Sequence, residues 1–407
     1  MILWLAFKNI FHKPLHAVLN IIIFATGIGI ITMLSLVQRQ FEDKFEKNIE
    51  GIDMVMGASG SPLQLILSAV YHIDAPTGNI PLEEAEKWMK HPYIASAVPM
   101  AYGDSYLSYP MIGSDSCYYK HFGAELASGV FNHSNYEVVV GADVVQKLKL
   151  KVGDKFHSTH GQQEGGEEHG NVTWVVTGIL KPTGKVIDRM IISNIESVWD
   201  IHGENGCTHD HADGEECHPH DHEEGREITA VLLKYRNPMA ALQLPRLIRE
   251  QSKNIQLAQP AIEINRLFSL LGIGLDAIRY LAYFIMGLSA ISIFISIYNT
   301  LKERMYELAM IRTLGGSKFK VFSLILSEGI LYSIFGYLTG LVLGVVGYRM
   351  VAMLAENEYQ LSFGNLPLDI TQQAMLLAIS LFIGFLAAIF PAIKSYFIQI
   401  SSTLSYE

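Results

Sequence analysis

Charged residues are scarce in this sequence. Lys, Arg, Asp and Glu together make up 17% of the 407 residues, whereas hydrophobic residues make up 50%. The mean hydropathy is +0.24. Because about a quarter of the residues of an ordinary soluble protein are charged, this composition predicts a membrane protein with a sizeable polar part.

Motifs for nucleotide binding and catalysis are also missing. The sequence contains no G-x-x-x-x-G-K-[ST], since Gly184-Lys185 is followed by Val186 and no matching glycine precedes it. The chain therefore lacks the loop that cradles ATP phosphates. No Ser-His-Asp set or carboxylate pair stands out either. We expect no enzyme activity, no catalytic residue and no intrinsic cofactor.

Four long runs are free or nearly free of fixed charge. They comprise 25 residues after Lys13, 22 after Arg279, 28 after Lys320 (interrupted only by Glu328) and 24 after Asp369. Each exceeds the ~20 residues that cross ~30 Å of hydrocarbon, so the sequence predicts four membrane-spanning helices. The first run could instead be a signal peptide. We favour a membrane span, because Gln38-Arg39-Gln40 is a poor cleavage site.

The distribution of Lys and Arg beside these runs predicts the orientation. Basic residues precede the first run, fill the segment 302–320 and follow the fourth run, whereas the segment between the third and fourth runs is mostly acidic. Both termini and segment 302–320 are therefore expected in the cytoplasm. The long segment 41–272 is expected in the periplasm, so that the chain is a multi-pass protein of the bacterial inner membrane.

The sequence predicts three regions. Residues 1–40 form a cytoplasmic helix and the first span, residues 41–272 an α+β periplasmic domain, and residues 273–407 the last three spans with a cytoplasmic helix at 302–318. In the periplasmic domain, β-branched runs predict strands, and apolar spacing after a proline or glycine predicts helices. The strands are expected at 138–140, 173–180, 186–193 and 228–235, and the helices at 82–88, 142–148 and 238–251.

Two features of the third span concern packing. Gly336, Gly340 and Gly344 recur every fourth residue, a pattern that lets a second helix approach closely. Glu328 lies inside the span near its cytoplasmic end. An intramembrane carboxylate is a functional candidate, but here we favour a structural pairing with a nearby Lys or Arg.

The cytoplasmic segment ERMYELAMIRTLGGSKFKVFSLILSEG is the most informative motif. It combines a charged amphipathic helix, the Gly315-Gly316 break and a second helix that enters the membrane. Such a lever at the inner face of the bilayer needs a soluble partner. It resembles the coupling helix of FtsX-like and MacB-like ABC transporter permeases, the family that includes lipoprotein-release permeases. The residues that match are Glu303, Arg304, Glu307, Leu308, Ile311, Arg312, Leu314 and Gly315.

The resemblance covers nearly the whole chain. The C-terminal Pro391-Ala392 with Lys394 and the ending Leu404-Ser405-Tyr406-Glu407 are similar to the tail of the family, although Ser402 lies near its usual proline. Segments 53–79 and 178–191 resemble permeases with a MacB-like periplasmic core.

The resemblance implies a non-enzymatic permease subunit that works with a separate cytosolic ATPase. The ATPase would bind Mg-ATP and contact Glu303, Arg304, Glu307, Arg312 and Gly315, and the permease would form a homodimer surrounded by lipid. Cargo stays open. The alternatives are a lipoprotein-releasing permease, a regulator of periplasmic cell-wall hydrolases and a metal-sensing scaffold, each with its own periplasmic or lipoprotein partner. Nothing in the sequence points to nucleic acid.

The segment CTHDHADGEECHPHDHEEG, from Cys207 to Gly225, is rich in metal ligands. It supplies −7 of the net charge of −10. Imidazole and thiolate suit Zn²⁺, and closely spaced His residues let a flexible chain wrap an ion. The spacing is not that of a zinc finger, so we favour a low-affinity zinc collector over a rigid site. The alternative is a solvated loop, with or without a Cys207–Cys217 disulfide, that binds no metal. The expected ligands are His202, Cys207, His209, His211, Cys217, His218, His220 and His222, with His157, His160 and His169 as further candidates.

Overall fold

The computed structural model describes residues 2–159, 172–204, 226–359 and 369–397. The chain divides into two compact units, one formed by Met1–Glu42 and Leu270–Glu407 and the other by Asp43–Ser269. The boundaries fall inside helix α2 (Pro14–Ile49) and helix α9 (Pro260–Glu303), so both helices contribute residues to both units.

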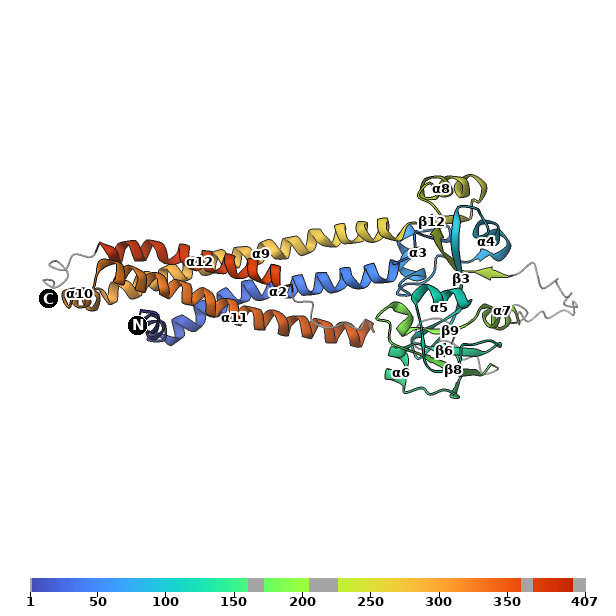
Figure 1. Ribbon diagram of the computed structural model, residues 1–407, viewed down its shortest axis with the longest axis horizontal. Helices are drawn as coiled ribbons and strands as arrows, with labels where there is room; N and C mark the ends of the chain where they lie inside the picture. The colour runs from blue at the N-terminus through green and yellow to red at the C-terminus, as the bar shows by residue number, and fades with distance from the viewer. Residues whose placement is uncertain (1, 160–171, 205–225, 360–368, 398–407) are drawn as a thin grey trace, which may run out of the picture. The chain divides into compact units, whose positions relative to one another are not determined.

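The first unit is a bundle of long helices. It contains α1 (Ile2–Ile10), most of α2 and α9, α10 (Met305–Thr313), α11 (Lys318–Tyr359) and α12 (Ile370–Tyr396). The long helices run alongside one another in Figure 1. Among the described residues, four helices are long and apolar enough to span a membrane: Pro14–Ile49, Pro260–Glu303, Lys318–Ala355 and Ile370–Tyr396. The prediction of four spans is thereby confirmed.

Helix α11 packs closely on α2 along its glycines. A Cβ atom added at Gly336 would lie 2.3 Å from Phe24, one at Gly340 would lie 2.7 Å from Ile28, and one at Gly344 would lie 2.6 Å from Thr32. Real Cβ atoms do not approach other heavy atoms so closely, so side chains at these positions would force the two helices apart.

The second unit is built on a ten-stranded mixed sheet. Its strand order is β12-β1-β11-β3-β4-β9-β6-β8-β5, with β7 paired to β8, and a separate pair joins β10 to β2. Most neighbours are antiparallel, whereas β4–β9 and β6–β8 are parallel. The predicted α+β fold is confirmed.

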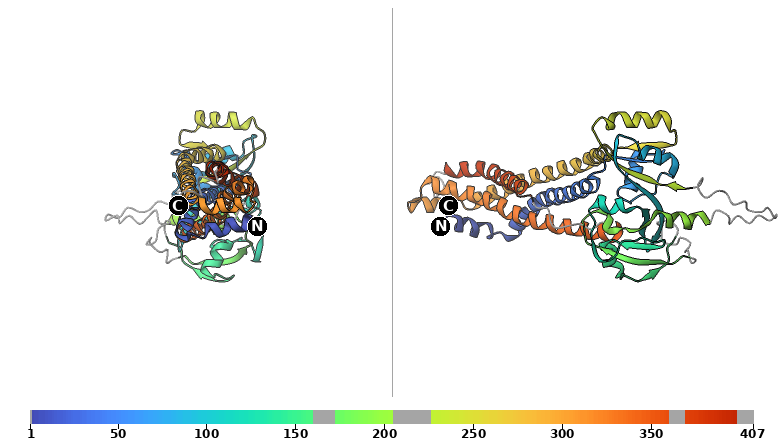
Figure 2. Two further views of the ribbon diagram at one scale, coloured as in Figure 1. Left: turned by 90° about the vertical axis from the view of Figure 1, so that its left-hand side faces the viewer. Right: turned by 45° about the vertical axis from the view of Figure 1, so that its right-hand side comes forward.

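The elements of this unit follow one another as the chain runs out of α2 and back into α9, with helices on the faces of the sheet (Figures 1 and 2). The strands are β1 (Met54–Ala58), β2 (Ile80–Pro81), β3 (Ile94–Tyr106), β4 (Tyr109–Ser114), β5 (Leu126–Gly129), β6 (Glu137–Val140), β7 (Lys155–Phe156), β8 (Trp174–Leu180), β9 (Ile191–Asn194), β10 (Glu227–Ile228), β11 (Ala230–Tyr235) and β12 (Ile255–Ala258). The helices are α3 (Pro62–Ala69), α4 (Leu82–Met89), α5 (Ser116–Phe122), α6 (Ala142–Leu148), the 3-10 helix η1 (Val186–Arg189), α7 (Ile195–Glu204) and α8 (Ala240–Gln251).

Several local predictions are confirmed, and two are wrong in part. The strand at 138–140 lies in β6, and the helix at 142–148 is α6. The expected strand 186–193 begins instead as the 3-10 helix η1, because the carboxylate of Asp188 accepts hydrogen bonds from the backbone N–H groups of Thr183 and Gly184 and closes a turn. The expected strand 228–235 is divided at Thr229 into β10 and β11, which have different pairing partners.

A buried histidine lies in the core of the second unit. His72 Nδ1 contacts the hydroxyl of Tyr102, which donates its proton to the carbonyl of Ser68, so Nδ1 is the donor in this pair. Nε2 then accepts from the Tyr118 hydroxyl at 3.3 Å. The neutral ring is thus satisfied on both sides. Burial, together with the charge of Arg189, lowers the pKa of His72 from 6.5 to about 3.

We expect the pH dependence of stability to carry a term from His72. Its pKa is depressed in the folded state, so only the unfolded chain takes up this proton between pH 6.5 and 3, and stability falls as the pH falls through that window. The loss between pH 6.5 and 5 is about 2 kcal/mol. The loss of stability is measured by proteolysis of the second unit in urea, with the full-length protein at pH 6.5 and at pH 5. In His72→Asn the pH slope should drop by about one proton; equal slopes in both proteins would contradict this assignment.

We expect Gly340→Val to destabilise the helix bundle by about 1–3 kcal/mol, because its side chain would overlap Ile28 and the carbonyl of Ala25. The matched control is Gly287→Val in α9, where an added Cβ meets no atom within 4 Å. Thermal aggregation of the full-length protein in detergent compares the two. Close packing at Gly340 would be contradicted if Gly340→Val aggregated at the same temperature as the wild type, or if Gly340→Val and Gly287→Val were destabilised equally.

Candidate functional site

The cytoplasmic end of the bundle carries the element that the sequence singled out. Helix α9 ends at Glu303, the backbone leaves helical geometry at Arg304, and α10 follows from Met305. Helix α10 closes with a glycine cap, because Gly316 N donates to Ile311 O at 2.9 Å and Gly315 has φ +97°. Ser317 then caps α11 by accepting from Lys320 N at 3.3 Å.

The side chains of this element are unequally exposed. Leu308 and Ala309 of α10 are buried against the bundle. The large apolar side chains on the outer side are exposed, notably Leu314 at 83% and Phe319 at 68%. Large apolar side chains are exposed along the membrane-spanning helices as well, for example Ile370 at 85%, as expected where helices face lipid. The feature that distinguishes this element is therefore its short helix, set between the break at Arg304 and the glycine cap.

The predicted coupling residues hold ion pairs within the bundle. Glu303 pairs with Lys13, the residue before α2. Arg304 Nε lies 3.2 Å from Glu307 Oε2, and the Arg304 side chain is largely buried while that of Glu307 is exposed. Arg312 lies in the last turn of α10 and is half-buried. Glu303, Glu307 and Gly315 of this set are exposed, whereas Arg304 and Arg312 are partly buried.

Helix α1 joins this end of the bundle through a buried polar contact. Asn9 Nδ2 donates to Glu328 Oε1 at 2.8 Å, inside the contact between α1 and α11. The hydrogen-bond partner of Glu328 is therefore an amide, whereas the expected basic residue, Arg304, acts on the carboxylate through its charge. Asn9 comes from a position 319 residues away along the chain, which explains why the sequence pointed to charged neighbours instead.

Lysine and tyrosine side chains line the same end. Lys394 Nζ donates to the Tyr298 hydroxyl at 2.7 Å and lies over its ring, and Lys302 lies over the same ring at 5.0 Å. Lys318 lies 5.6 Å from the ring of Tyr396. These cation–π contacts gather positive charge where α9, α11 and α12 meet the cytoplasm.

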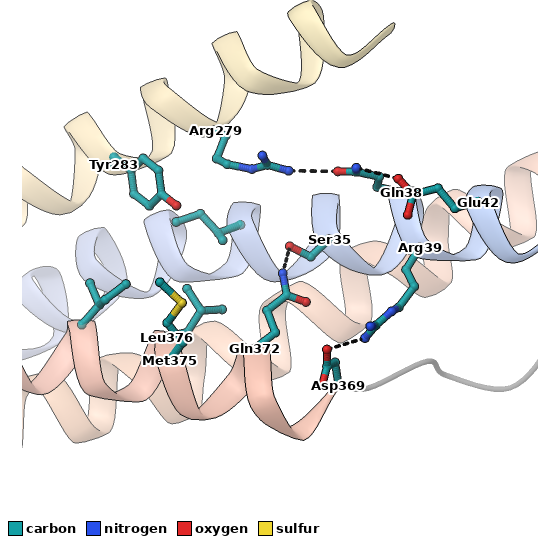
Figure 3. Close-up of a pocket in the computed structure, with 12 residues that line it drawn as sticks. Ser35, Gln38, Arg39, Glu42, Arg279, Tyr283, Asp369, Gln372, Met375 and Leu376 are labelled. Atoms are coloured by element: carbon teal, nitrogen blue, oxygen red, sulfur yellow. Dashed lines mark hydrogen bonds and ion pairs between the residues drawn. The ribbon is translucent and has the colours of Figure 1, made fainter. Parts of the chain in front are cut away.

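At the opposite end of the spans, α2, α9 and α12 enclose a pocket of about 390 Å³ (Figure 3). Arg39 Nη1 pairs with Asp369 Oδ2 at 2.8 Å, and Arg279 Nη2 donates to Gln38 Oε1 at 2.9 Å. Gln372 Nε2 donates to Ser35 Oγ at 2.6 Å across α12 and α2. Sequence reasoning identified Arg39, Arg279 and Asp369 only as the ends of spans and missed that they converge.

The candidate metal ligands do not form a site in the described part of the chain. Within residues 2–159, 172–204, 226–359 and 369–397, no three His, Cys, Asp or Glu side chains are placed to hold a metal ion. His157 Nδ1 contacts the carbonyl of Val172 at 2.8 Å. The side chain of His202 and all of Cys207, His209, His211, Cys217, His218, His220, His222, His160 and His169 lie outside the described residues.

The sequence matches two family models. The one described as the FtsX-like permease C-terminal region matches residues 280–403, and the one described as the MacB-like periplasmic core domain matches residues 17–212. The first covers most of α9 together with α10 to α12. The second runs from α2 through most of the sheet. No curated protein matches the sequence.

Two solved structures are similar to part of the chain. The periplasmic region of MacB from Actinobacillus actinomycetemcomitans is 16% identical with a TM-score of 0.35, over 55% of this chain and 97% of that one. The extracellular domain of the noncanonic ABC-type transporter YknZ from Gram-positive bacteria is 11% identical with a TM-score of 0.33, over 51% of this chain and 99% of that one.

Proposed function

Because the chain belongs to the family of FtsX-like permeases with a MacB-like periplasmic core domain, we propose that it is the membrane subunit of an ABC transporter driven by a separate cytosolic ATPase. The chain is a multi-pass inner-membrane protein whose large domain lies in the periplasm. The observation that supports the proposal is the short helix α10 between α9 and α11, which is bounded by the break at Arg304 and the cap at Gly315 and presents the exposed side chain of Glu307.

Helices α9 and α2 supply the route from α10 to the periplasmic unit. Helix α9 starts at Pro260 in the periplasmic unit and ends at Glu303, one residue before the kink that starts α10. Helix α2 runs from Pro14 to Ile49, and its last turns bind the loop before η1 through Asn48 Oδ1, which accepts from Val186 N at 2.8 Å. A displacement of α10 by an ATPase would therefore act on helices whose far ends lie inside the periplasmic core.

The proposed assembly is a homodimer of this chain above an ATPase dimer. The absence of a phosphate-binding loop from the whole sequence supports a separate ATPase. The proposed function is the transfer of a conformational change to the periplasm. Release of lipoproteins and control of cell-wall hydrolases are narrower versions of the same function, and neither is favoured by a contact in the described residues.

We expect Gly315→Val to uncouple ATP hydrolysis from the permease without preventing membrane insertion. Valine at φ +97° is strained, so the link between α10 and α11 must change shape. ATP hydrolysis by the ATPase that co-purifies with the chain should fall several-fold. Gly153→Val is the matched control, since Gly153 has φ +95° in the periplasmic unit and open space around it. Unchanged hydrolysis in Gly315→Val, or equal losses in both variants, would count against coupling through α10.

A link to zinc is a second proposal, and it is supported by the sequence of segment 202–225 alone. Five His, two Cys and seven acidic residues between Cys207 and Gly225 provide many interchangeable ligands for a borderline-soft cation. Such a segment would concentrate zinc at the periplasmic face of the permease. Oxidation of Cys207 and Cys217 would remove both thiolates and leave imidazoles and carboxylates.

We expect deletion of Gly206–Gly225 to abolish most zinc binding and to leave the periplasmic unit folded. Ligand imidazoles must be neutral, so binding by the wild type should fall steeply between pH ~7 and ~5.5. Zinc titration of both full-length proteins, reduced and oxidised, gives the stoichiometry. Equal stoichiometry in the two proteins would exclude this segment as the zinc site, and unfolding of the deletion variant would favour a rigid structural site instead.

A further inference from the structure

The pocket between α2, α9 and α12 combines a charged rim with an apolar wall (Figure 3). Arg39 follows the apolar run of α2, Arg279 precedes that of α9, and Asp369 precedes that of α12, so all three lie at the level where the periplasmic interface begins. Ile31 lies eight residues before Arg39, and Ile379 lies ten residues after Asp369. At 1.5 Å per residue the wall therefore reaches about 12–15 Å into the outer leaflet.

The rim carries both signs of charge. Arg39 and Arg279 supply two cations, Glu42 and Asp369 supply two anions, and Asp276 adds a third carboxylate through its ion pair with Arg279 at 2.8 Å. A simple anion would meet three carboxylates here, and a simple cation would meet two guanidinium groups. A headgroup that itself carries one positive and one negative charge is the better match, since guanidinium groups fit phosphate oxygens and carboxylates accept from ammonium groups.

The charged groups keep hydrogen-bonding capacity for a ligand. A guanidinium has five N–H donors. Arg39 uses one of them on Asp369, and Arg279 uses two, on Asp276 and Gln38. Asp369 accepts from Thr371 N with Oδ1 and pairs with Arg39 through Oδ2, whereas Glu42 accepts one hydrogen bond from Gln38 among the described residues. The side chains of Arg39 and Arg279 are 43% and 31% exposed, so a ligand can reach both.

The size of the pocket suits an amphiphile. A volume of about 390 Å³ lies within the range of roughly 300–1,000 Å³ that is usual for small-molecule sites. The wall below the rim is formed by buried Ile31 and Leu376 and by Ile379, whereas Met375 is largely exposed at its edge. An acyl chain that followed the wall would place its polar head at the ring.

We propose that this pocket binds one molecule of a zwitterionic aminophospholipid from the outer leaflet. Its phosphate lies at Arg39 and Arg279, its primary ammonium lies at Glu42 and Asp369, and one acyl chain follows Ile31, Leu376 and Ile379. The inference goes beyond the proposed function and does not rest on an ATPase, because the site is complete within one chain. One lipid molecule would contact the periplasmic ends of three spans, α2, α9 and α12.

Native mass spectrometry of the full-length chain in detergent tests the site. The protein is titrated with phosphatidylethanolamine, phosphatidylcholine and phosphatidylglycerol that carry the same acyl chains. We expect one phosphatidylethanolamine per chain, bound about tenfold more tightly than the other two, since choline cannot donate a hydrogen bond and glycerol carries no positive charge. Equal binding of phosphatidylglycerol, or no saturable binding of phosphatidylethanolamine, would overturn the proposal.

Variants of the rim residues distinguish a lipid-binding site from a set of ion pairs that only stabilises the helix packing. Arg279→Gln should weaken phosphatidylethanolamine about tenfold, and Glu42→Gln should remove the preference over phosphatidylcholine. Arg246→Gln is the control, because Arg246 is an exposed arginine of α8 that pairs with Glu250 at 3.0 Å, outside the pocket. Binding that is unchanged in Arg279→Gln and Glu42→Gln would overturn the site.

A third variant keeps the test valid if loss of a rim charge unfolds the protein. Met375→Trp should fill the pocket without altering any charge, and the 65% exposure of Met375 means that little packing is lost. We expect this variant to melt like the wild type and to lose lipid binding. Wild-type binding in Met375→Trp, with reduced melting temperature in Arg279→Gln, would show that the ring is a structural lock only.

Discussion

The close approach of α11 to both α2 and α12 is the packing on which the helix bundle depends. On the α12 side, a Cβ added at Gly329 would lie 2.6 Å from the carbonyl oxygen of Gly384. Lipid tails are as apolar as Leu or Ile side chains, so burial of apolar surface cannot drive helices together in a membrane, and van der Waals packing must do so. Gly340 brings its backbone so near to α2 that even a methyl group would meet Ile28 and the carbonyl of Ala25. Gly29 of α2 returns the contact, since its own added Cβ would lie 3.2 Å from Gly340 O.

Polar contacts at the two ends of the bundle add to this packing. Near the cytoplasm, Glu328 of α11 holds α1 through Asn9, and Lys13 before α2 holds the end of α9 through Glu303. Near the periplasm, Arg39 of α2 holds the start of α12 through Asp369. An unpaired polar group is costly in hydrocarbon, so the buried Asn9–Glu328 pair specifies one register of α1 on α11.

Local signals made much of the fold predictable from the sequence. Helix α6 was predicted at its observed bounds because a buried strand, a glycine and an apolar helical repeat follow one another within residues 138–148. Gly141 adds a tertiary reason that no local pattern contains: a Cβ there would lie 2.4 Å from the carbonyl oxygens of Asp188 and Ile187. The strand prediction at 186–193 was wrong for the first half of the segment, because its β-branched residues favour a strand. In the structure, the Asp188 carboxylate accepts a hydrogen bond from Thr183 N, and this half forms η1.

The candidate sites were predictable only where one segment contains them. The coupling element lies within residues 303–320, so its helix, glycine cap and second helix were all visible in the sequence. The partner of Glu328 and the ring of Arg39, Arg279 and Asp369 join residues from distant parts of the chain. Arg39, Arg279 and Asp369 each have an ordinary local explanation as the end of a span, and only the packing of α2, α9 and α12 brings them together. Asn9 and Glu328 meet only because α1 packs on α11.

Helix α9 links the two ends of the bundle physically. Arg279 at the pocket and Glu303 at the start of the coupling element are 24 residues apart in one unbroken helix, which corresponds to about 36 Å along its axis. A helix transmits a shift along its axis better than a loop does, because each turn is hydrogen-bonded to the next. If α9 slides or turns as one body, Arg279 moves relative to Gln38 of α2 and the pocket changes shape. If the proposed ATPase displaces α9 at its cytoplasmic end, the same displacement would move one side of the pocket.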